Sequence, residues 1–577
     1  MMGYMDVYKQ WAENEHFDAE TRAELAAIAG NEKEIEDRFY KNLEFGTGGL
    51  RGVIGAGTNR MNIYTVRRAT QGLANYILKV NPAGKDMGVA IAHDSRRFSP
   101  EFTEAAALVL CGNGIKTYVF DSLRPTPELS FAVRRLGCIA GAVVTASHNP
   151  PEYNGYKVYW SDGGQVPYPM DEAIIDEVNA VEDFAAIPSM DKAEALAKGL
   201  LVVLGKEIDD EYIANVKAQS VNPGIGAELG DSFKIVYTPL HGTGNIPVRR
   251  ALSEMGFTSV AVVPEQEKPD GNFPTVSYPN PEDPKAFALA MKLADDIGAD
   301  IICATDPDAD RVGAVVRNDK NEYVILTGNM TGALLTEYVL SGRKAAGTLP
   351  ADAAIVSTIV STNMTKVIAD HYNAAYFDVL TGFKYIGAKI KDFELANSHS
   401  YVFGFEESYG CLAGTYARDK DAVVSTMLVC EMAAAYKKRG MTLYDGLLEL
   451  YAKYGFYTES IESITMKGVE GVAQIKGMMK AMRENPPADI NGVKVVETRD
   501  YKSGVIAYTD GAPNAPTNLP ESDVLYFALA DESWFAVRPS GTEPKIKIYF
   551  GVKGTSREDA ADKVAVFSAA ALAKVKG

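Results

Sequence analysis

The chain has 577 residues, of which 46% are hydrophobic and 23% are charged, so it is long enough to bury several cores and is expected to form several domains. Its 58 lysines and arginines stand against 76 aspartates and glutamates, a net charge of -18, which disfavours nucleic-acid binding and requires that an anionic ligand meet local positive charge. The first residues lack the basic and apolar regions of a signal peptide, and apolar runs such as 200–205 are too short to cross a bilayer, so we expect a cytoplasmic protein without membrane contact.

The first third of the chain alternates between predicted helices and strands. The first forty residues carry apolar side chains at helical spacing. An apolar strand at 87–93 is followed by a helix that we expect to begin at Pro100 with Ser99 as its cap, and then by a strand at 115–120. Strand, helix and strand in this order predict a parallel sheet.

The same order returns twice, with strands at 234–240 and 299–305 and then at 353–360 and 374–380. The C-terminal segment from residue 457 is predicted instead to form hairpin-like strands followed by late helices, which is an α+β pattern. The predicted fold class is therefore three related α/β domains with mixed parallel sheets, followed by a C-terminal α+β domain. We expect the domains to span residues 1–220, 221–328, 329–456 and 457–577.

A serine and a histidine follow an apolar strand in the sequence TASHNPP at 145–151. Pro150 favours an extended backbone at Asn149, so Ser147 is expected on a rigid loop. Neighbouring side chains of an extended segment point to opposite sides, so the adjacency of Ser147 and His148 does not by itself indicate a nucleophile. A turn serine that bonds its own backbone remains an alternative.

Three aspartates occupy alternate positions in DPDADR at 306–311, directly after an apolar strand. An extended backbone would place Asp306, Asp308 and Asp310 on one side, where they would repel one another unless a hard cation such as Mg²⁺ compensated. An EF-hand is excluded, because its required glycine and glutamate positions hold Arg311 and Arg317. A solvated aspartate-rich turn is the remaining alternative.

The sequence GFEESYG at 404–410 places Glu406 and Ser408 two positions apart after a strand. An acceptor and a donor in that arrangement suit the hydroxyls of a sugar, although a loop with a solvated pair of acids would look the same.

The sequence RPSGTEPK at 538–545 combines charged and hydroxyl side chains with a glycine that frees backbone amides. These are the parts of a phosphate cradle, and an ordinary proline-glycine turn is the alternative. The earlier glycine-rich segment at 46–52 lacks the pattern of a nucleotide P-loop.

Taken in order, TASHNP, DPDADR, GFEES and RPSGTEP resemble the four active-site loops of the α-D-phosphohexomutases, and the resemblance covers almost the whole chain. The segment FGTGGLRGVIGAGTNRMN and the length are most similar to the phosphoglucomutase branch, which includes phosphopentomutase-like members. The resemblance implies four domains around one central cleft.

The resemblance also implies a role for each matching residue. The implied catalytic residues are Ser147, which would carry the phosphate, His148, Lys420 and Arg51. The implied metal ligands are Ser147, through its phosphate, Asp306, Asp308 and Asp310. The implied substrate-binding residues are Lys157, Arg311, Thr381, Gly382, Lys384, Glu406, Ser408, Arg538, Ser540, Gly541 and Thr542. Phe383 stands where some relatives have histidine or tryptophan, so no hydrogen bond is carried over to that position.

The implied reaction interconverts glucose 1-phosphate and glucose 6-phosphate through a phosphoserine and glucose 1,6-bisphosphate, with Mg²⁺ as the metal. Mannose or pentose phosphates remain alternative substrates. Two other classes also remain: a phosphotransferase that carries its phosphate on Asp306, and a sugar-phosphate sensor without catalysis. We expect sugar phosphates as the only partners, and a monomer or a weak homodimer.

Overall fold

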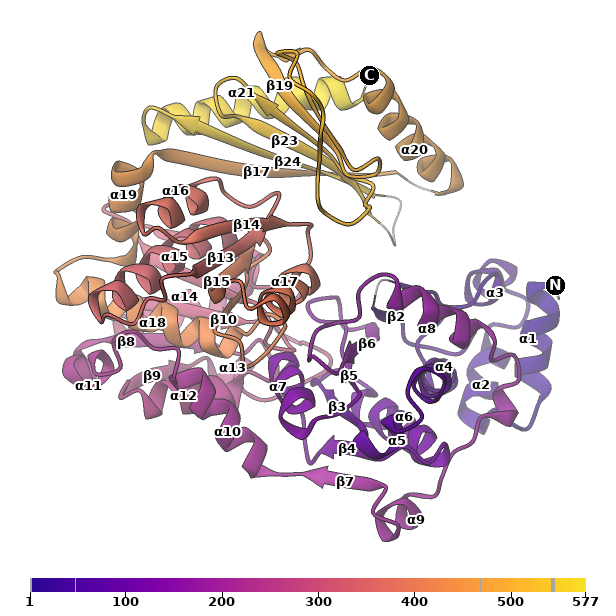
Figure 1. The fold of residues 1–577 in the computed structure, drawn as a ribbon. Coiled ribbons are helices and arrows are strands. Elements are labelled where there is room, and N and C mark those ends of the chain that lie inside the picture. Colours follow the sequence, from indigo (N-terminus) through magenta and orange to yellow (C-terminus); the bar gives the residue numbers. More distant parts are fainter. Residues whose placement is uncertain (1–2, 47, 467, 541–544, 577) are drawn as a thin grey trace. The chain divides into compact units, whose positions relative to one another are not determined.

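The computed structural model describes residues 3–46, 48–466, 468–540 and 545–576. The chain divides into two compact units, both of which combine helices with sheets (Figure 1). The first unit contains the residues through Ile325 together with Gly387–Asn397 and Tyr409–Gly440. The second unit contains Leu326–Ile386, Ser398–Ser408 and the residues from Met441 onward.

The first sheet of the first unit mixes parallel and antiparallel strands in the order β1-β2-β6-β5-β3-β4-β7. The pairs β5-β3, β3-β4 and β4-β7 are parallel, whereas β1-β2, β2-β6 and β6-β5 are antiparallel. The strands are β1 (Phe45–Gly46), β2 (Gly49–Val53), β3 (Val89–His93), β4 (Thr117–Phe120), β5 (Ala140–Val144), β6 (Tyr153–Trp160) and β7 (Leu201–Leu204).

Helices cover this sheet and bury its apolar side chains. Ile77 and Leu110 from two of the helices share one core with Ile91 and Val144 from the strands. The amino-terminal helices form a smaller cluster, in which Trp11 stacks on Phe17. The helices are α1 (Tyr4–Glu13), α2 (Ala19–Ala27), α3 (Glu32–Phe39), α4 (Ile63–Val80), α5 (Gly84–Met87), α6 (Ser99–Gly112), α7 (Thr126–Leu136), α8 (Met170–Asn179) and α9 (Lys192–Ala197).

The start of α6 differs from the prediction. The helix begins at Ser99, with Phe98 in the cap position, and no side chain caps it. The Ser99 hydroxyl instead donates a 2.9 Å hydrogen bond to Oδ1 of Asp94, which is fully buried. A hydrogen bond to a carboxylate is stronger than one between neutral groups, which explains why the Ser99 hydroxyl bonds Asp94 and not the first amides of the helix. The prediction of Ser99 as the cap was therefore wrong.

The second sheet of the first unit has the order β12-β11-β10-β8-β9. Strand β8 pairs in parallel with β9 and β10, and β10 pairs antiparallel with β11, so residues 306–311 form the connection between β10 and β11. Helix α18 packs against β10, β11 and α12. The strands are β8 (Lys234–Thr238), β9 (Ser259–Val262), β10 (Ile301–Thr305), β11 (Val312–Arg317) and β12 (Tyr323–Leu326). The helices are α10 (Lys206–Lys217), α11 (Ile225–Leu229), α12 (Asn245–Glu254), α13 (Pro264–Glu267), α14 (Ala288–Ile297) and α18 (Ala422–Lys438), which follows β16 (Gly410–Ala413).

The second unit begins with an α/β segment in which β14, β13 and β15 lie side by side in that order. Strand β13 is parallel to both neighbours. The elements are α15 (Gly328–Ala345), β13 (Ala353–Thr358), α16 (Met364–His371), β14 (Ala375–Val379), β15 (Ser400–Glu406) and α19 (Leu443–Tyr454). Helix α17 (Phe383–Ala396) begins in this unit and from Gly387 onward belongs to the first unit.

The rest of the second unit is an antiparallel sheet in the order β17-β24-β23-β22-β19-β20-β21. Helices α20 and α21 bury side chains such as Met479 and Phe567 against one face of this sheet, and on the other face Trp534 and Tyr549 share a cluster with Leu380. The elements are β17 (Phe456–Thr465), α20 (Gly468–Glu484), β18 (Asp489–Ile490), β19 (Val493–Asp500), β20 (Val505–Tyr508), β21 (Ala515–Pro516), β22 (Leu525–Leu529), β23 (Trp534–Pro539), β24 (Lys545–Gly554) and α21 (Arg557–Lys576).

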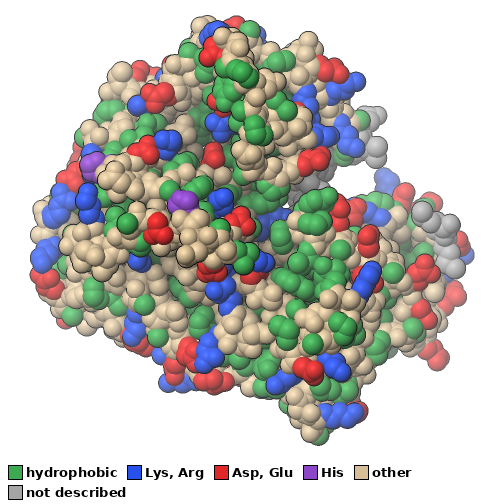
Figure 2. Space-filling model, viewed as in Figure 1, with side chains coloured by type: hydrophobic (Ala, Val, Ile, Leu, Met, Phe, Trp, Pro, Cys, Tyr) green, Lys and Arg blue, Asp and Glu red, His purple; other side chains and the backbone are tan. Residues whose placement is uncertain are grey.

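The fold class predicted from the sequence, α/β units followed by an α+β tail, is confirmed. Throughout the described ranges, no helix has the length and apolar character needed to span a membrane. Acidic and basic side chains are interspersed over the face that Figure 2 displays. On this face, positive charge for an anionic ligand would therefore have to come from particular side chains and not from a large basic surface.

Candidate active site

Ser147 lies in a tight turn after β5 and is buried. Its φ of 51° is in the left-handed region, so the segment is not extended, contrary to the prediction from the sequence. Because of this turn, the side chains of Ser147 and His148 come together, with His148 Nδ1 3.1 Å from Ser147 Oγ. Ser147 Oγ also donates a 2.8 Å hydrogen bond to Oδ2 of Asp306.

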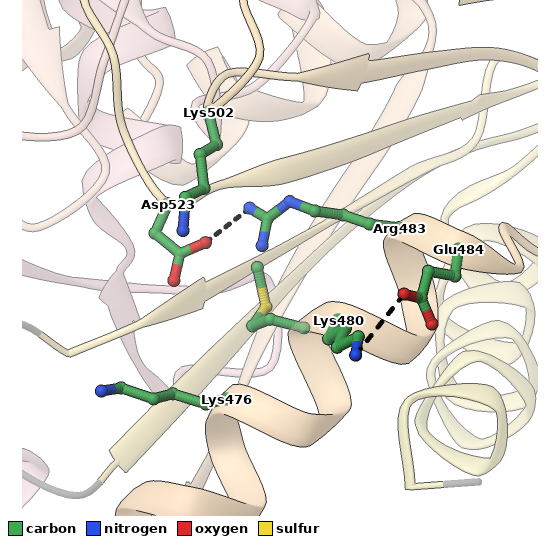
Figure 3. A pocket seen from close by; sticks show the side chains of 7 residues that line it. Lys476, Lys480, Arg483, Glu484, Lys502 and Asp523 are labelled. Atoms are coloured by element: carbon green, nitrogen blue, oxygen red, sulfur yellow. Dashed lines mark hydrogen bonds and ion pairs between the residues drawn. The ribbon is translucent and has the colours of Figure 1, made fainter.

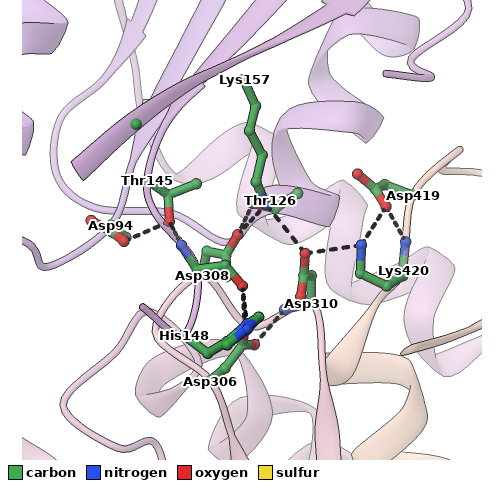
Figure 4. Close-up of polar contacts among 12 residues, drawn as sticks. Asp94, Thr126, Thr145, His148, Lys157, Asp306, Asp308, Asp310, Asp419 and Lys420 are labelled. Carbon is green, nitrogen blue, oxygen red and sulfur yellow. Dashed lines mark hydrogen bonds and ion pairs between the residues drawn. The ribbon is translucent and has the colours of Figure 1, made fainter. Parts of the chain in front are cut away.

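The carboxylates of Asp306, Asp308 and Asp310 converge, as predicted, with one oxygen of each within 4.8 Å of the others (Figure 4). A turn brings them together, because Ala309 has a φ of 50° and its amide donates to the carbonyl of Asp306. Oδ1 of Asp306 accepts the amides of Asp310 and Arg311 at 3.1 and 3.0 Å. The loop therefore orients its own first carboxylate.

Two lysines approach the cluster from different elements, and both have contacts with Asp310 (Figure 4). Lys157, on β6, places Nζ 2.8 Å from Asp308 Oδ2 and 3.4 Å from Asp310 Oδ2. Lys420, before α18, places Nζ 3.1 Å from Asp310 Oδ2 and 3.2 Å from Asp419 Oδ1. The structure therefore brings both predicted lysines to the carboxylates.

The three carboxylates differ in their affinity for a proton. Burial, with the neighbouring charges of Asp310 and Asp308, raises the pKa of Asp306 well above its ordinary value. Burial also disfavours charge on Asp310, but Lys420 and Lys157 outweigh it and lower the pKa of Asp310. The two lysines contact Asp308 and Asp310, so the negative charge of Asp306 has the least compensation of the three.

The donor set fits a hard divalent cation. Oδ1 of Asp308 and Oδ1 of Asp310 are buried and, among the described residues, have no hydrogen-bond partner. Buried carboxylate oxygens without partners are costly, and carboxylate oxygen is the ligand that Mg²⁺ and related cations prefer. Asp306, Asp308 and Asp310 can therefore hold such an ion.

Two arginines carry positive charge near the loop that holds Ser147 and His148. Arg51, on β2, donates a 3.0 Å hydrogen bond from Nη1 to Oδ1 of Asn149, and Arg311 pairs with Glu282 at 2.5 Å. Burial and the charges of Arg311 and Arg51 hold the pKa of His148 well below its ordinary value, so the imidazole is neutral at neutral pH.

Four residues of this site were missed from the sequence: Asp94, Arg96, Thr126 and Thr145. Thr126, the first residue of α7, donates to Asp308 twice, from Oγ1 to Oδ2 and from its amide to the carbonyl, both at 2.9 Å. The only available signal was the pattern RPTP at 124–127, which marks a helix start. This pattern gives no sign that Thr126 contacts Asp308, which lies 182 positions further along the sequence.

The second unit holds the other predicted residues. Ser408 Oγ donates to Oε1 of Glu406 at 2.8 Å, so the predicted pair does come together. Glu407, which was not among the residues predicted from the sequence, accepts a 2.8 Å hydrogen bond from Thr358 Oγ1. Burial and the adjacent Glu406 raise the pKa of Glu407 to about 7, although Arg538 acts in the opposite direction.

Five further predicted residues belong to the same unit: Thr381, Gly382, Lys384, Arg538 and Ser540. Gly382 has a φ of 120° at the loop before α17, Oγ1 of Thr381 is buried, and Lys384 Nζ lies 5.2 Å from the Tyr385 ring. Arg538 lies on β23, and the Ser540 amide donates to the Lys545 carbonyl at 2.7 Å. Gly541 and Thr542 lie outside the described residues.

A concave surface of about 580 Å³ beside α20 is not the candidate site (Figure 3). Its basic side chains have acidic neighbours, with Arg483 2.5 Å from Asp523 and Lys480 3.7 Å from Glu484. None of the residues predicted from the four motifs lines it.

Four family models match the chain in series. They are described as the α/β/α domains I, II and III and the C-terminal domain of phosphoglucomutase/phosphomannomutase, and they match residues 42–184, 210–320, 327–454 and 470–568. A phosphoglucomutase of Staphylococcus aureus (strain USA300) is 37% identical over 537 residues, which cover 92% of this chain and 94% of that protein.

Solved structures share the fold. A putative phosphomannomutase from Thermus thermophilus superposes with a TM-score of 0.67 at 22% identity, covering 93% of this chain and 100% of that one. The open form of parafusin, a phosphoglucomutase from Paramecium, superposes with a TM-score of 0.66 at 16% identity, covering 93% of this chain and 96% of that one.

Proposed function

We propose a specific reaction for this chain, which belongs to the phosphoglucomutase/phosphomannomutase family and is therefore an intramolecular phosphotransferase of the isomerase class. The reaction is the interconversion of glucose 1-phosphate and glucose 6-phosphate. Ser147 carries the phosphoryl group between turnovers, and glucose 1,6-bisphosphate is the intermediate.

One observation carries this proposal. The Ser147 hydroxyl is 2.8 Å from Asp306 in a buried cluster of three carboxylates, two of which have an oxygen without a partner among the described residues. Binding a sugar phosphate does not require a serine at such a cluster, whereas phosphoryl transfer to and from that serine does. This favours a carrier over a sensor without catalysis.

The transfer step moves one phosphoryl group. The bond between phosphorus and Oγ of Ser147 breaks, and a bond forms to a hydroxyl oxygen of the sugar monophosphate. A basic group of the site takes the proton of that hydroxyl, and the released Oγ of Ser147 takes up a proton. Lys420 is our candidate for that group, as the family resemblance implies, and it accepts the proton as the neutral amine; its Nζ lies 3.1 Å from Asp310 Oδ2. The return step reverses these changes at the other end of the bisphosphate.

The positive side chains stabilise the phosphate on Ser147. Arg311, Arg51 and Lys157 supply charge, and neutral His148 adds a hydrogen-bonding group beside Oγ. Asp306, Asp308 and Asp310, with a phosphate oxygen on Ser147, would hold Mg²⁺. A bound Mg²⁺ neutralises charge on phosphoryl oxygens and so makes serine a better leaving group.

Further residues of the predicted set would bind the rest of the substrate in this proposal. Glu406 and Ser408 bind sugar hydroxyls. The segment RPSGTEPK at 538–545 holds the phosphate that is not being transferred, through Arg538, Ser540, Gly541 and Thr542. The residues that bind the sugar from the loop before α17 are Thr381, Gly382 and Lys384.

Glucose is the proposed sugar because the Staphylococcus aureus relative is named a phosphoglucomutase. The test is a comparison of kcat/KM for the 1-phosphates of glucose, mannose, ribose and deoxyribose, each with its bisphosphate present. We expect glucose 1-phosphate to be preferred by at least about tenfold, because a site built to bond a hydroxyl rejects substrates that misplace it. Preference for another sugar would reassign the substrate and leave the mechanism intact.

A further inference from the structure

The backbone of Ser147 is held in a conformation that a serine does not favour. Its φ of 51° is uncommon for a residue with a side chain, and such conformations persist only where surrounding contacts fix them. The contacts that fix this turn come from Thr145, the first residue of the motif TASHNP, and from Asp94 and Arg96, which lie outside the four motifs.

The first set is a relay of hydrogen bonds. The amide of Ser147 donates to Thr145 Oγ1 at 2.8 Å, and the Thr145 hydroxyl donates to Oδ2 of Asp94 at 2.6 Å. Asp94 is itself held by Ser99 Oγ and by the amide of Arg96, both 2.9 Å from Oδ1. Asp94 and Thr145 are each 1% exposed, so water does not compete for these bonds.

The second set is a single guanidinium that binds the backbone around Ser147. Nη2 of Arg96 donates to the carbonyl of Ser147 at 2.5 Å and also to the carbonyl of Asn149. Nη1 donates to the carbonyls of Pro150 and Tyr153 at 2.8 and 3.0 Å. One side chain therefore ties four carbonyls of the loop to one rigid, planar fork.

The Arg96 guanidinium is buried and is held by an ion pair and by an aromatic ring. Its Nε lies 3.3 Å from Oδ2 of Asp94, with both side chains fully buried, so the relay and the fork are joined. The Phe273 ring covers the guanidinium with its centroid 4.9 Å from Cζ, and a Cβ at Gly271 would lie 2.8 Å from the carbonyl carbon of Arg96. The loop through 271–273 thus packs tightly on the segment that carries Arg96.

We propose that Arg96 and the relay from Asp94 through Thr145 are positioning residues for phosphoryl transfer, which keep the Ser147 oxygen directed at the carboxylate cluster during both half-reactions. This inference rests on the proposed function of Ser147. The turned backbone is what brings Ser147 Oγ to 2.8 Å from Asp306, and a displacement of about 1 Å in a reacting group costs about 100-fold in rate.

The most direct test compares two substitutions of Thr145. Thr145→Val keeps the shape of the side chain and removes the hydroxyl from the relay, whereas Thr145→Ser keeps the hydroxyl. We expect Thr145→Val to lower kcat about 100-fold with KM within about threefold, and Thr145→Ser to recover to within about tenfold of the wild type. A kcat for Thr145→Val within about threefold of the wild type, or equal slowing in both variants, would overturn the inference.

A stability control separates positioning from general damage. Ile77→Ala opens a cavity in the core of the same part of the chain and touches neither the relay nor the loop. We expect it to lower Tm at least as much as Thr145→Val and to keep kcat within about threefold of the wild type. If its kcat falls as far as that of Thr145→Val, the slowing reflects destabilisation and the inference fails.

Arg96→Lys tests the fork, because lysine keeps the charge but cannot bind four carbonyls. Where this variant folds, by circular dichroism, we expect kcat to fall at least as far as in Thr145→Val. Where it does not fold, the comparison of Thr145→Val with Thr145→Ser decides whether the positioning role holds.

Transfer of phosphate from glucose 1,6-bisphosphate to each protein, followed by mass spectrometry, separates the two proposals. A wild-type protein that gains no phosphate on Ser147 refutes the proposed function, whereas equal rates in wild type and Thr145→Val refute only the positioning role.

Discussion

Oγ of Ser147 donates a 2.8 Å hydrogen bond to Oδ2 of Asp306, although the two residues are 159 positions apart in the sequence. They come from the ends of β5 and β10, strands of two different sheets in the first unit. The site is therefore assembled by the packing of two α/β segments, and its properties follow from the charges that those segments bring together.

The buried pair of Lys157 and Asp308 is expected to stabilise the metal-free protein. Lys157→Met leaves Asp308 buried without its cation, and the loss of one partner of a buried ion pair costs about 3–5 kcal/mol. The exposed pair of Lys198 and Glu194 is the control, because Lys198→Met should cost under about 1 kcal/mol. Thermal unfolding without divalent ions measures both, and equal Tm values for the two variants would contradict the prediction.

Metal binding is expected to stabilise the first unit through the carboxylate cluster. Mg²⁺ at about 100 times its Kd should add about 2.7 kcal/mol of stability, which raises Tm by several degrees. The double variant Asp308→Asn with Asp310→Asn should lose this rise, because it removes the negative charge of two of the three carboxylates that can hold the ion. Asp319→Asn, at an exposed turn, is the control and should keep it. A rise of the same size in the double variant would place the ion elsewhere.

Gly242 is expected to be essential to the position of the carboxylate loop. A Cβ at this position would lie 2.6 Å from the carbonyl oxygen of Pro307 and 2.8 Å from its carbonyl carbon, which are backbone atoms that cannot move aside alone. Gly242→Ala should therefore displace Pro307 and reduce kcat by about 100-fold or more. Gly477→Ala, in α20 with nothing within 4 Å, should stabilise slightly and leave kcat unchanged. Full activity of Gly242→Ala would show that the loop tolerates this displacement.

The raised pKa of Glu407 predicts a pH-dependent stability. Its pKa is about 7 in the folded protein against an ordinary 4.5, so between these values the folded state keeps a proton that the unfolded state has released. Stability from this group is therefore present at low pH and is lost as the pH rises towards about 7. Glu407→Gln, which can still accept the bond from Thr358, should match the wild type near pH 4.5.

Above about pH 7, the same variant should be more stable than the wild type by at most about 3 kcal/mol, because the charge of Glu407 is then unfavourable beside Glu406. Unfolding midpoints at about pH 5 and about pH 8 measure this difference. Glu462→Gln, at an exposed position of β17, is the control for the substitution itself. A stability gain for Glu407→Gln that is the same at both pH values would contradict the raised pKa.

Much of this architecture could be predicted because alternating strands and helices leave a local pattern in the sequence. The convergence of Asp306, Asp308 and Asp310 was also predictable, but the reason was wrong: a turn at Ala309 brings them together, not an extended backbone. A left-handed alanine has no sequence signal, since alanine has no particular preference for positive φ.

The supporting residues could not be predicted for a different reason. Thr126 and Arg96 act through hydrogen bonds to residues 182 and 51 positions away, and short motifs do not encode contacts across such distances. Ser99 illustrates the same limit, because its local pattern is that of a helix cap, yet a buried carboxylate outside the helix takes its hydroxyl. Local sequence indicated which groups converge in the candidate site better than it indicated which groups hold them.

The central claim is that Ser147 carries the phosphate, and the most direct measurement is the site of phosphate after incubation with glucose 1,6-bisphosphate and Mg²⁺. Tandem mass spectrometry of the wild type should locate phosphate on Ser147 that survives neutral hydroxylamine, and Ser147→Ala should gain none and lose interconversion of the glucose phosphates. Hydroxylamine-labile phosphate on Asp306, or undiminished interconversion by Ser147→Ala, would contradict the claim.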